Sequence, residues 1–157
     1  MSVCIFLAAD CVLPQKQRPE NGFHIDFDLA TGIIFDGDRD DDYGLCPFMD
    51  VGSYSELRHG VEIEWFYCTP GRAKELIRYI KTALKQCDRV ELWKVWLGGF
   101  YEYDERPCYR TRELSIQELT AADIQEIADS NVWEKGDSNL WKKGGRRPVY
   151  HCLTVVR

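Results

Sequence analysis

Apolar and polar positions form their clearest pattern in the middle of the chain. Residues 61–67 alternate apolar with acidic side chains before turning aromatic, which is the period of a strand with one buried face. Residues 70–86 carry apolar side chains three and four positions apart, and Thr69 and Pro70 supply a helix start, so an amphipathic helix is predicted there. Residues 90–97 are rich in β-branched and aromatic residues. The pattern predicts a β-α-β unit with a right-handed parallel crossover.

The same alternation predicts which side chains share a face of this unit. We expect Glu62 and Glu64 to lie on the face away from the helix, beside Lys94 and Trp96 of the second strand. Lys94 would then be the counter-ion of Glu62 or Glu64. The residues expected to face the helix are Ile63, Trp65, Trp93, Val95 and Leu97.

The flanking segments extend this unit into one domain. Thr120 and Asp123 have the spacing of a capping motif, which predicts a second, short helix over residues 121–129. Further strands are predicted in the apolar run before Asp10, in a hairpin over 23–28 and 33–35, in 109–114 and in 149–156. We therefore predict a single α+β domain spanning residues 1–157. Its mixed sheet would have about five to seven strands, with the main helix on one face and the short helix near the edge.

Composition narrows the classes of function. The 157 residues carry a net charge of −6, which argues against a binder of nucleic acids or anionic membranes. A local basic run over 142–147 lies near Trp133 and Trp141 and could hold a phosphate, but the net charge opposes this function. No apolar stretch is long enough to span a bilayer. Aromatic residues make up 13% of the chain, and this surplus must fill a core, a groove or an interface.

Metal and cofactor sites are not expected. The seven cysteines are scattered without a Cys-x-x-Cys pair, which predicts neither a disulfide framework nor a zinc site and fits a reducing cytoplasm. The acidic stretch 36–44 opens like a calcium loop, but Asp41 stands where the turn needs glycine and Pro47 where the bidentate glutamate belongs. His24, Asp26 and Asp28 would form a row on one strand face, which we interpret as a polar outer face.

Catalytic signatures are also missing from the sequence. The glycine-rich nucleotide loops, the His-Glu-x-x-His motif and the Gly-x-Ser-x-Gly motif do not occur. A ligand crevice, if the chain has one, is expected at the carboxyl ends of the two central strands, around Trp96, with Tyr101 and Tyr103 above it. Glu62 or Glu64 would then act as the acid or base.

The sequence therefore predicts a small cytoplasmic binding protein without catalytic activity or cofactor, which offers acidic and aromatic surface to a protein partner. An inhibitor or immunity-type protein that neutralises a basic partner fits this description, as does a homodimer. The rival hypothesis is an enzyme or small-ligand binder that uses the aromatic crevice. The candidate binding residues are Glu62, Glu64, Lys94, Trp96, Tyr101 and Tyr103.

Overall fold

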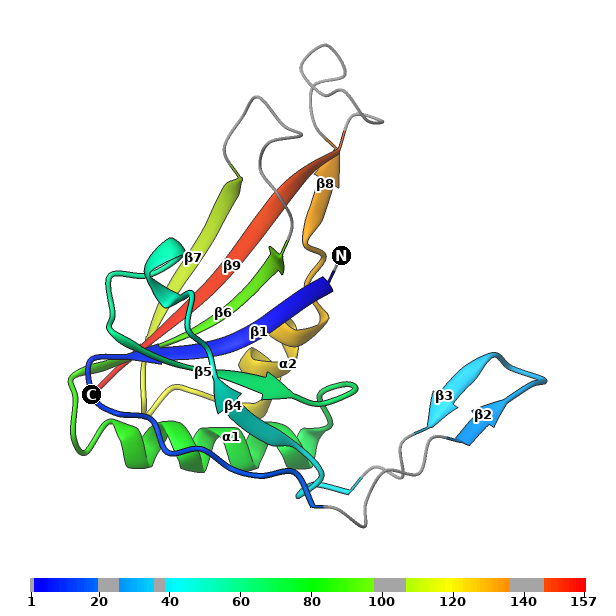
Figure 1. Cartoon of the computed structure of the whole chain (residues 1–157), viewed down its shortest axis with the longest axis horizontal. Coiled ribbons are helices and arrows are strands. Elements are labelled where there is room, and N and C mark those ends of the chain that lie inside the picture. Colours follow the sequence, from blue (N-terminus) through cyan, green and yellow to red (C-terminus); the bar gives the residue numbers. More distant parts are fainter. Residues whose placement is uncertain (1, 20–25, 36–38, 98–106, 136–145) are drawn as a thin grey trace.

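A computed structural model describes residues 2–19, 26–35, 39–97, 107–135 and 146–157 (Figure 1). The predicted α+β class is confirmed, with a seven-stranded sheet, a two-stranded hairpin and two α-helices. The strands are β1 (Ser2–Ala9), β2 (Asp26–Asp28), β3 (Ile33–Phe35), β4 (Gly44–Pro47), β5 (His59–Glu64), β6 (Arg89–Leu97), β7 (Cys108–Ser115), β8 (Trp133–Lys135) and β9 (Arg146–Val156). The helices are α1 (Pro70–Ala83), α2 (Ala121–Asp129) and the 3-10 turn η1 (Val51–Ser53).

The order of the strands contradicts the predicted β-α-β unit. The sheet runs β4-β5-β1-β6-β9-β7, with β8 also pairing with β9, so β1 lies between the strands that flank α1 and is antiparallel to both. Residues 6–9 of β1 are completely buried. The unbroken apolar run of this strand suits a position that is covered on both faces of the sheet. The adjacent parallel pair of the sheet is β7 with β9, connected through α2 and β8.

Both helices begin where their capping residues predict. The Thr69 side chain accepts a hydrogen bond from the backbone N–H of Arg72, and Pro70 occupies the first turn of α1. Thr120 and Asp123 form a reciprocal capping box at the start of α2, whose predicted bounds are confirmed. The predicted main helix ends three residues early, at Ala83, because the next residues tighten into i→i−3 hydrogen bonds.

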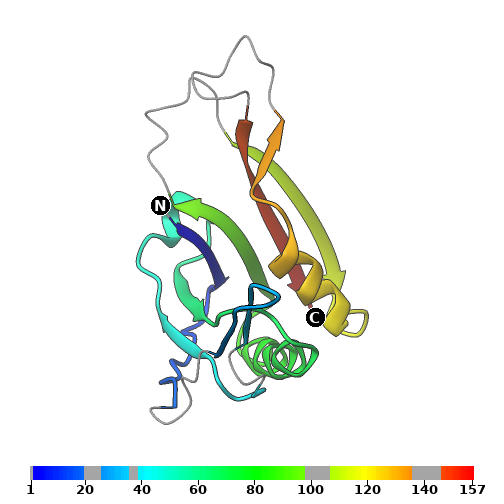
Figure 2. The same ribbon diagram turned by 90° about the vertical axis from the view of Figure 1, so that its right-hand side faces the viewer.

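The two faces of the sheet bury different cores. Both helices cover one face, and Figure 2 looks nearly along α1 with α2 beside it. Alternate strand residues such as Leu7, Val61 and Leu92 pack there against Leu76 and Ile80 of α1. The opposite face is covered by residues 48–57, which we call the covering segment. The opposite core contains Cys4, Phe6, Ala8, Phe48, Val51, Leu57, Trp93, Val95, Tyr150 and Cys152.

The predicted hairpin is confirmed, but one of its expected buried residues is not. β2 and β3 pair with each other through residues 26–28 and 33–35 and project from the rest of the chain (Figure 1). Gly32 in the connecting turn has a φ of 69°, which favours glycine. The alternation along residues 23–28 predicts an inward position for Phe27, but this side chain is 55% exposed, so that prediction is wrong.

Candidate functional site

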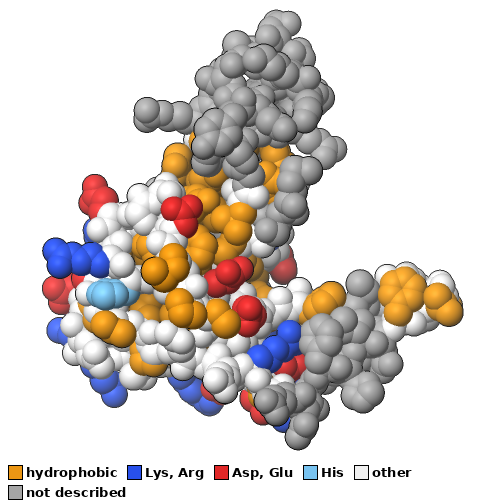
Figure 3. All heavy atoms as spheres, in the orientation of Figure 1, with side chains coloured by type: hydrophobic (Ala, Val, Ile, Leu, Met, Phe, Trp, Pro, Cys, Tyr) orange, Lys and Arg blue, Asp and Glu red, His pale blue; other side chains and the backbone are white. Residues whose placement is uncertain are grey.

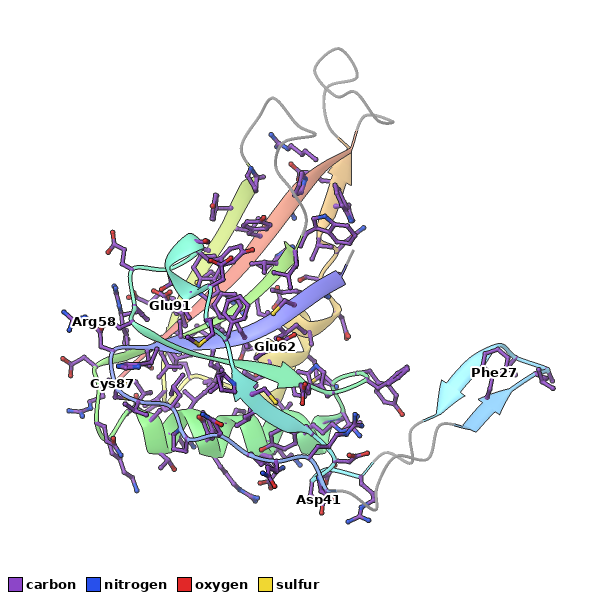
Figure 4. The ribbon with its side chains drawn as sticks, in the orientation of Figure 1. Phe27, Asp41, Arg58, Glu62, Cys87 and Glu91 are labelled. Carbon is purple, nitrogen blue, oxygen red and sulfur yellow. The ribbon has the colours of Figure 1, made fainter. Side chains whose placement is uncertain are left out.

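The face of the sheet away from the helices brings two carboxylates beside an aromatic cluster. Glu62 and Glu64 alternate along β5 and therefore point to the same side (Figure 4). Glu62 is paired in register with Phe6 of β1, and Phe6 is paired with Trp93 of β6. We call this side of the sheet the acidic-aromatic face, in which most of the rings are buried and Tyr109 reaches the surface. It consists of Glu62, Glu64, Phe6, Phe48, Tyr54, Trp93, Tyr109 and Tyr150.

The aromatic rings of this face form one connected group. Phe6 stacks on Phe48 with ring centroids 4.3 Å apart and lies parallel to Trp93 at 6.2 Å. Tyr150 makes edge contacts with Tyr54 and Tyr109, each at 5.5 Å. Tyr109 is 50% exposed, so the group ends in an aromatic ring at the surface. The rings that support it are packed against one another, which fixes its position.

The two carboxylates have thiols for neighbours. The Cys46 thiol donates to Glu64 Oε2 at 3.1 Å, and this hydrogen bond raises the pKa of Cys46. Burial, and then the charge of Glu62, raises the pKa of the Cys4 thiol well above its usual range. In the described part of the chain no lysine or arginine lies within ion-pair distance of Glu62 or Glu64. Their charges are therefore not neutralised by any described basic side chain.

Lys94 lies on the other side of the sheet, so its predicted ion pair with Glu62 or Glu64 is wrong. Its Nζ donates to the carbonyl oxygen of Ser130 at 2.7 Å and to that of Ala128, at the end of α2. The assignment of the β6 faces was inverted, because Leu92 packs with the helices and Lys94 shares its side. Burial lowers the pKa of Lys94, and the backbone carbonyls supply its hydrogen bonds.

The other predicted site residues do not join Glu62 and Glu64. Trp96, near the end of β6, packs against the edge of the opposite core, and its ring lies 4.9 Å from that of Trp133 in an edge contact. Tyr101 and Tyr103 lie outside the described residues. Among the described members of the predicted set, Glu62 and Glu64 therefore lie on the acidic-aromatic face, Trp96 contacts the edge of its core, and Lys94 lies on the helix side.

A cleft lies on the helix side of the sheet, bordered by α2, β7, β8 and β9. This cleft has a volume of about 490 Å³ and includes Arg110, Arg112, Glu134 and His151 in its lining, but neither Glu62 nor Glu64. Arg110 binds Glu134 at 2.8 Å, and Arg112 binds Asp123 at 2.8 Å. Hydrogen bonds from Arg147 and then Arg110 lower the pKa of Glu134. Both arginines that line the cleft are therefore held in ion pairs with neighbouring carboxylates.

Its histidine is also engaged by the backbone. His151 Nε2 lies 3.0 Å from the carbonyl oxygen of Asn131. Burial raises the pKa of the Cys152 thiol on the same strand to about 12, so this thiol is protonated near neutral pH and is a poor nucleophile. Burial likewise raises the pKa of Cys68 to about 11. Neither thiol therefore has the lowered pKa of an activated nucleophile, and the His151 ring is hydrogen-bonded to the backbone rather than to a thiol.

Two carboxylates of the acidic stretch, at positions 41 and 42, form ion pairs with arginines. Asp42 is buried and accepts two hydrogen bonds from Arg18, at 2.7 and 3.2 Å. Asp41 pairs with Arg39 at 3.0 Å. Across the ranges that the structure covers, no group of three or more His, Cys, Asp or Glu side chains could hold a metal ion. His24 lies outside those ranges.

The covering segment is the part of this face that sequence reasoning missed. Glu91 is 8% exposed and accepts hydrogen bonds from Ser55 Oγ at 2.6 Å and from Trp93 Nε1 at 2.8 Å, which fastens the segment to β6 (Figure 4). Pro47 and Gly52 interrupt this stretch, which predicts an irregular segment. The available signal was a spacing of three between apolar residues, at Phe48, Val51, Tyr54 and Leu57, all of which contribute to the opposite core.

Comparison of the chain with protein-family models, with curated proteins and with solved structures finds no match. Neither α-helix of the described residues has the length and apolar character needed to cross a membrane.

Proposed function

We propose that this chain is a small non-catalytic interaction protein of the cytoplasm that binds a basic protein partner through the acidic-aromatic face. One observation carries the proposal: Glu62 and Glu64 share a face with an aromatic cluster, and no described lysine or arginine pairs with either of them. A partner's lysine or arginine would supply the missing counter-charge. The protein would act as an inhibitor or immunity-type protein if the partner's basic site is its active surface.

Large apolar side chains are exposed on this face and next to it, as expected of an interface. Tyr109 on β7 is 50% exposed, Met49 in the covering segment is 90% exposed, and Phe66, two residues after β5, is 44% exposed. Figure 3 shows apolar side chains gathered across the centre of this face with acidic side chains among them, while basic side chains lie at the left and lower margins and beside acidic side chains at the lower right. Aromatic rings and methionine are enriched at the centres of interfaces, and arginine on the partner can also bind aromatic faces.

A partner of different sequence fits this face better than a second copy. Symmetric pairing of the face with itself would bring Glu62 and Glu64 of both copies together. Like charges across an interface oppose association. We therefore favour a basic partner over a homodimer formed through this face.

The enzymatic alternative has less support. The two glutamates proposed as acid or base lie outside the cleft that His151 and Arg110 line. Glu134, the carboxylate within that cleft whose pKa is shifted, is shifted downward, which is unsuitable for a general acid. Its Arg110 and Arg147 partners serve it as structural counter-ions.

Affinity capture with matched variants tests the proposal. The baits are the intact chain, the E62Q/E64Q double variant and the E75Q/E126Q double variant, which makes the same charge change on the outer surfaces of α1 and α2. We expect one stoichiometric basic protein to be retained by the intact chain and by E75Q/E126Q, and to be lost with E62Q/E64Q. Equal retention by all three baits, or the absence of any such partner, would contradict the proposal.

A further inference from the structure

Two cysteines far apart in the sequence meet at the end of α1. Cys11 follows β1, and Cys87 lies in the turn between α1 and β6 (Figure 4). Their thiols share one acceptor, since Cys11 Sγ lies 3.7 Å and Cys87 Sγ 3.3 Å from the carbonyl oxygen of Ala83. Ala9 is paired in register with Val90, and the same antiparallel course carries the chain after β1 alongside the turn that contains Cys87.

The shared acceptor places the two thiols beside each other. Burial first, and then the neighbouring Cys11 thiol, raises the pKa of Cys87 to about 11. This shared backbone acceptor distinguishes the pair from Cys4, Cys46 and Cys152, whose thiols lie beside a glutamate or a threonine instead.

A small reagent can reach this pair from solvent. Cys11 is partly exposed, and a surface cavity of about 460 Å³ is lined by Asp10, Cys11, Gln86, Cys87, Asp88 and Arg89. Cys87 lines the same cavity but is only 9% exposed. An incoming oxidant would therefore meet Cys11 first, with Cys87 placed to complete the reaction.

We propose that Cys11 and Cys87 form a reversible redox site, at which a low-molecular-weight disulfide converts the two thiols into an intramolecular disulfide. The Cys11 thiolate attacks one sulfur of the small disulfide, which forms a mixed disulfide and releases one small thiol. Cys87 then loses its proton and attacks the sulfur of Cys11, which releases the second small thiol. This second step is the slower one, because Cys87 is mostly protonated near neutral pH and the proximity of the two sulfurs, rather than an activated thiolate, favours it. The two thiol protons end on the two released small thiols, so the protein is oxidised by two electrons and the reagent is reduced by two.

The bond would clamp the end of β1 to the turn between α1 and β6. Its formation draws the two sulfurs, which share the Ala83 carbonyl oxygen, to a bond of about 2.0 Å. Because the bond closes a long loop, it restricts the unfolded chain more than the folded one and raises the midpoint of thermal unfolding. In a reducing compartment the pair stays as thiols and reports a rise in disulfide oxidant. This site is independent of the acidic-aromatic face.

Treatment of the reduced protein with oxidised glutathione tests the proposal. We expect the intact mass to fall by two hydrogen atoms, peptide mapping to show a Cys11–Cys87 link, and the unfolding midpoint to rise until a reductant restores it. The C87S variant should instead accumulate glutathione on Cys11, and C46S should behave like the wild type. Glutathione retained on wild-type Cys11, a link between other cysteines, or thiols that all stay reduced would overturn the proposal. Since the wild type and C46S alone give these readouts, the test does not depend on the folding of C87S.

Discussion

Lys94 and Glu62 lie on opposite faces of the sheet, although only β1 separates their strands. The Lys94 amine is bound by the carbonyl groups of Ala128 and Ser130 at the end of α2. Unpaired carbonyls give a helix end partial negative charge, so this position suits a buried ammonium group. The buried ammonium group of β6 thereby binds the end of a helix, and the described residues leave Glu62 without a basic partner on its own face.

Neutralising the two glutamates should leave the fold intact. Because no described ion pair is lost, we expect E62Q/E64Q to change the free energy of unfolding by no more than about 0.5 kcal/mol. Urea denaturation of the double variant and the wild type measures this difference. A loss of several times that size would mean that the carboxylates stabilise the fold rather than remain available to a partner.

Glu91 should behave in the opposite way. Glu91→Ala leaves the hydroxyl of Ser55 and the indole N–H of Trp93 without their acceptor and releases the covering segment. We expect the free energy of unfolding to fall by about 2 to 4 kcal/mol, and Ser55→Ala to cost about 1 kcal/mol. Urea denaturation with tryptophan fluorescence measures both. A Glu91→Ala variant as stable as the wild type would show that this carboxylate does not anchor the covering segment.

The buried thiol of Cys152 predicts a loss of stability at alkaline pH. Its pKa is about 12 in the folded chain, against an ordinary value of 9.0, so the folded state retains a proton that the unfolded state releases. The stabilisation is complete below pH 9 and declines as the pH rises toward 12, by at most about 1.4 kcal/mol per pH unit. Denaturation curves collected between pH 8 and pH 11 test this slope. Cys152→Ala should show a shallower slope, and an unchanged slope in that variant would contradict the assignment.

Cys46 offers a local reporter of the charge at Glu64. Its thiol donates to the Glu64 carboxylate, and this hydrogen bond raises the thiol pKa. Glu64→Gln should therefore lower the pKa of Cys46, increase its thiolate fraction at pH 8 and speed its alkylation by iodoacetamide. Peptide mass spectrometry follows the rate at this residue, with E126Q as the control. Equal rates in E64Q and E126Q would show that the contact does not control the thiol.

Local signals carried most of what could be predicted. Thr69 and Pro70 at α1, and Thr120 with Asp123 at α2, act within one helical turn of the residues they cap. For the same reason the helix starts and the presence of the hairpin follow from the sequence. The insertion of β1 between β5 and β6 depends on a contact across the whole chain, for which no residue spacing gives a signal.

The faces of β6 show why the candidate site was only partly predictable. Residues 90–95 are buried on both sides, so apolar character does not distinguish the helix side from the other. Glu91 and Lys94 are buried polar residues in this run. Their hydrogen-bond partners come from segments distant in the sequence: the covering segment for Glu91, and the end of α2 for Lys94. Glu62 and Glu64 were placed correctly on the face away from the helix because β5 alternates cleanly between buried apolar and more exposed acidic residues.

The central claim is that a basic partner contacts Glu62 and Glu64. Zero-length carbodiimide cross-linking joins a carboxylate directly to a lysine amine that touches it, so it reports this contact without further assumption. Lysate of the source organism would be treated in the presence of the intact chain, and the cross-linked peptides would be identified by mass spectrometry. We predict that peptides containing Glu62 or Glu64 are joined to lysines of a single basic protein. Cross-links confined to carboxylates on α1 and α2, with none at Glu62 or Glu64, would contradict the account.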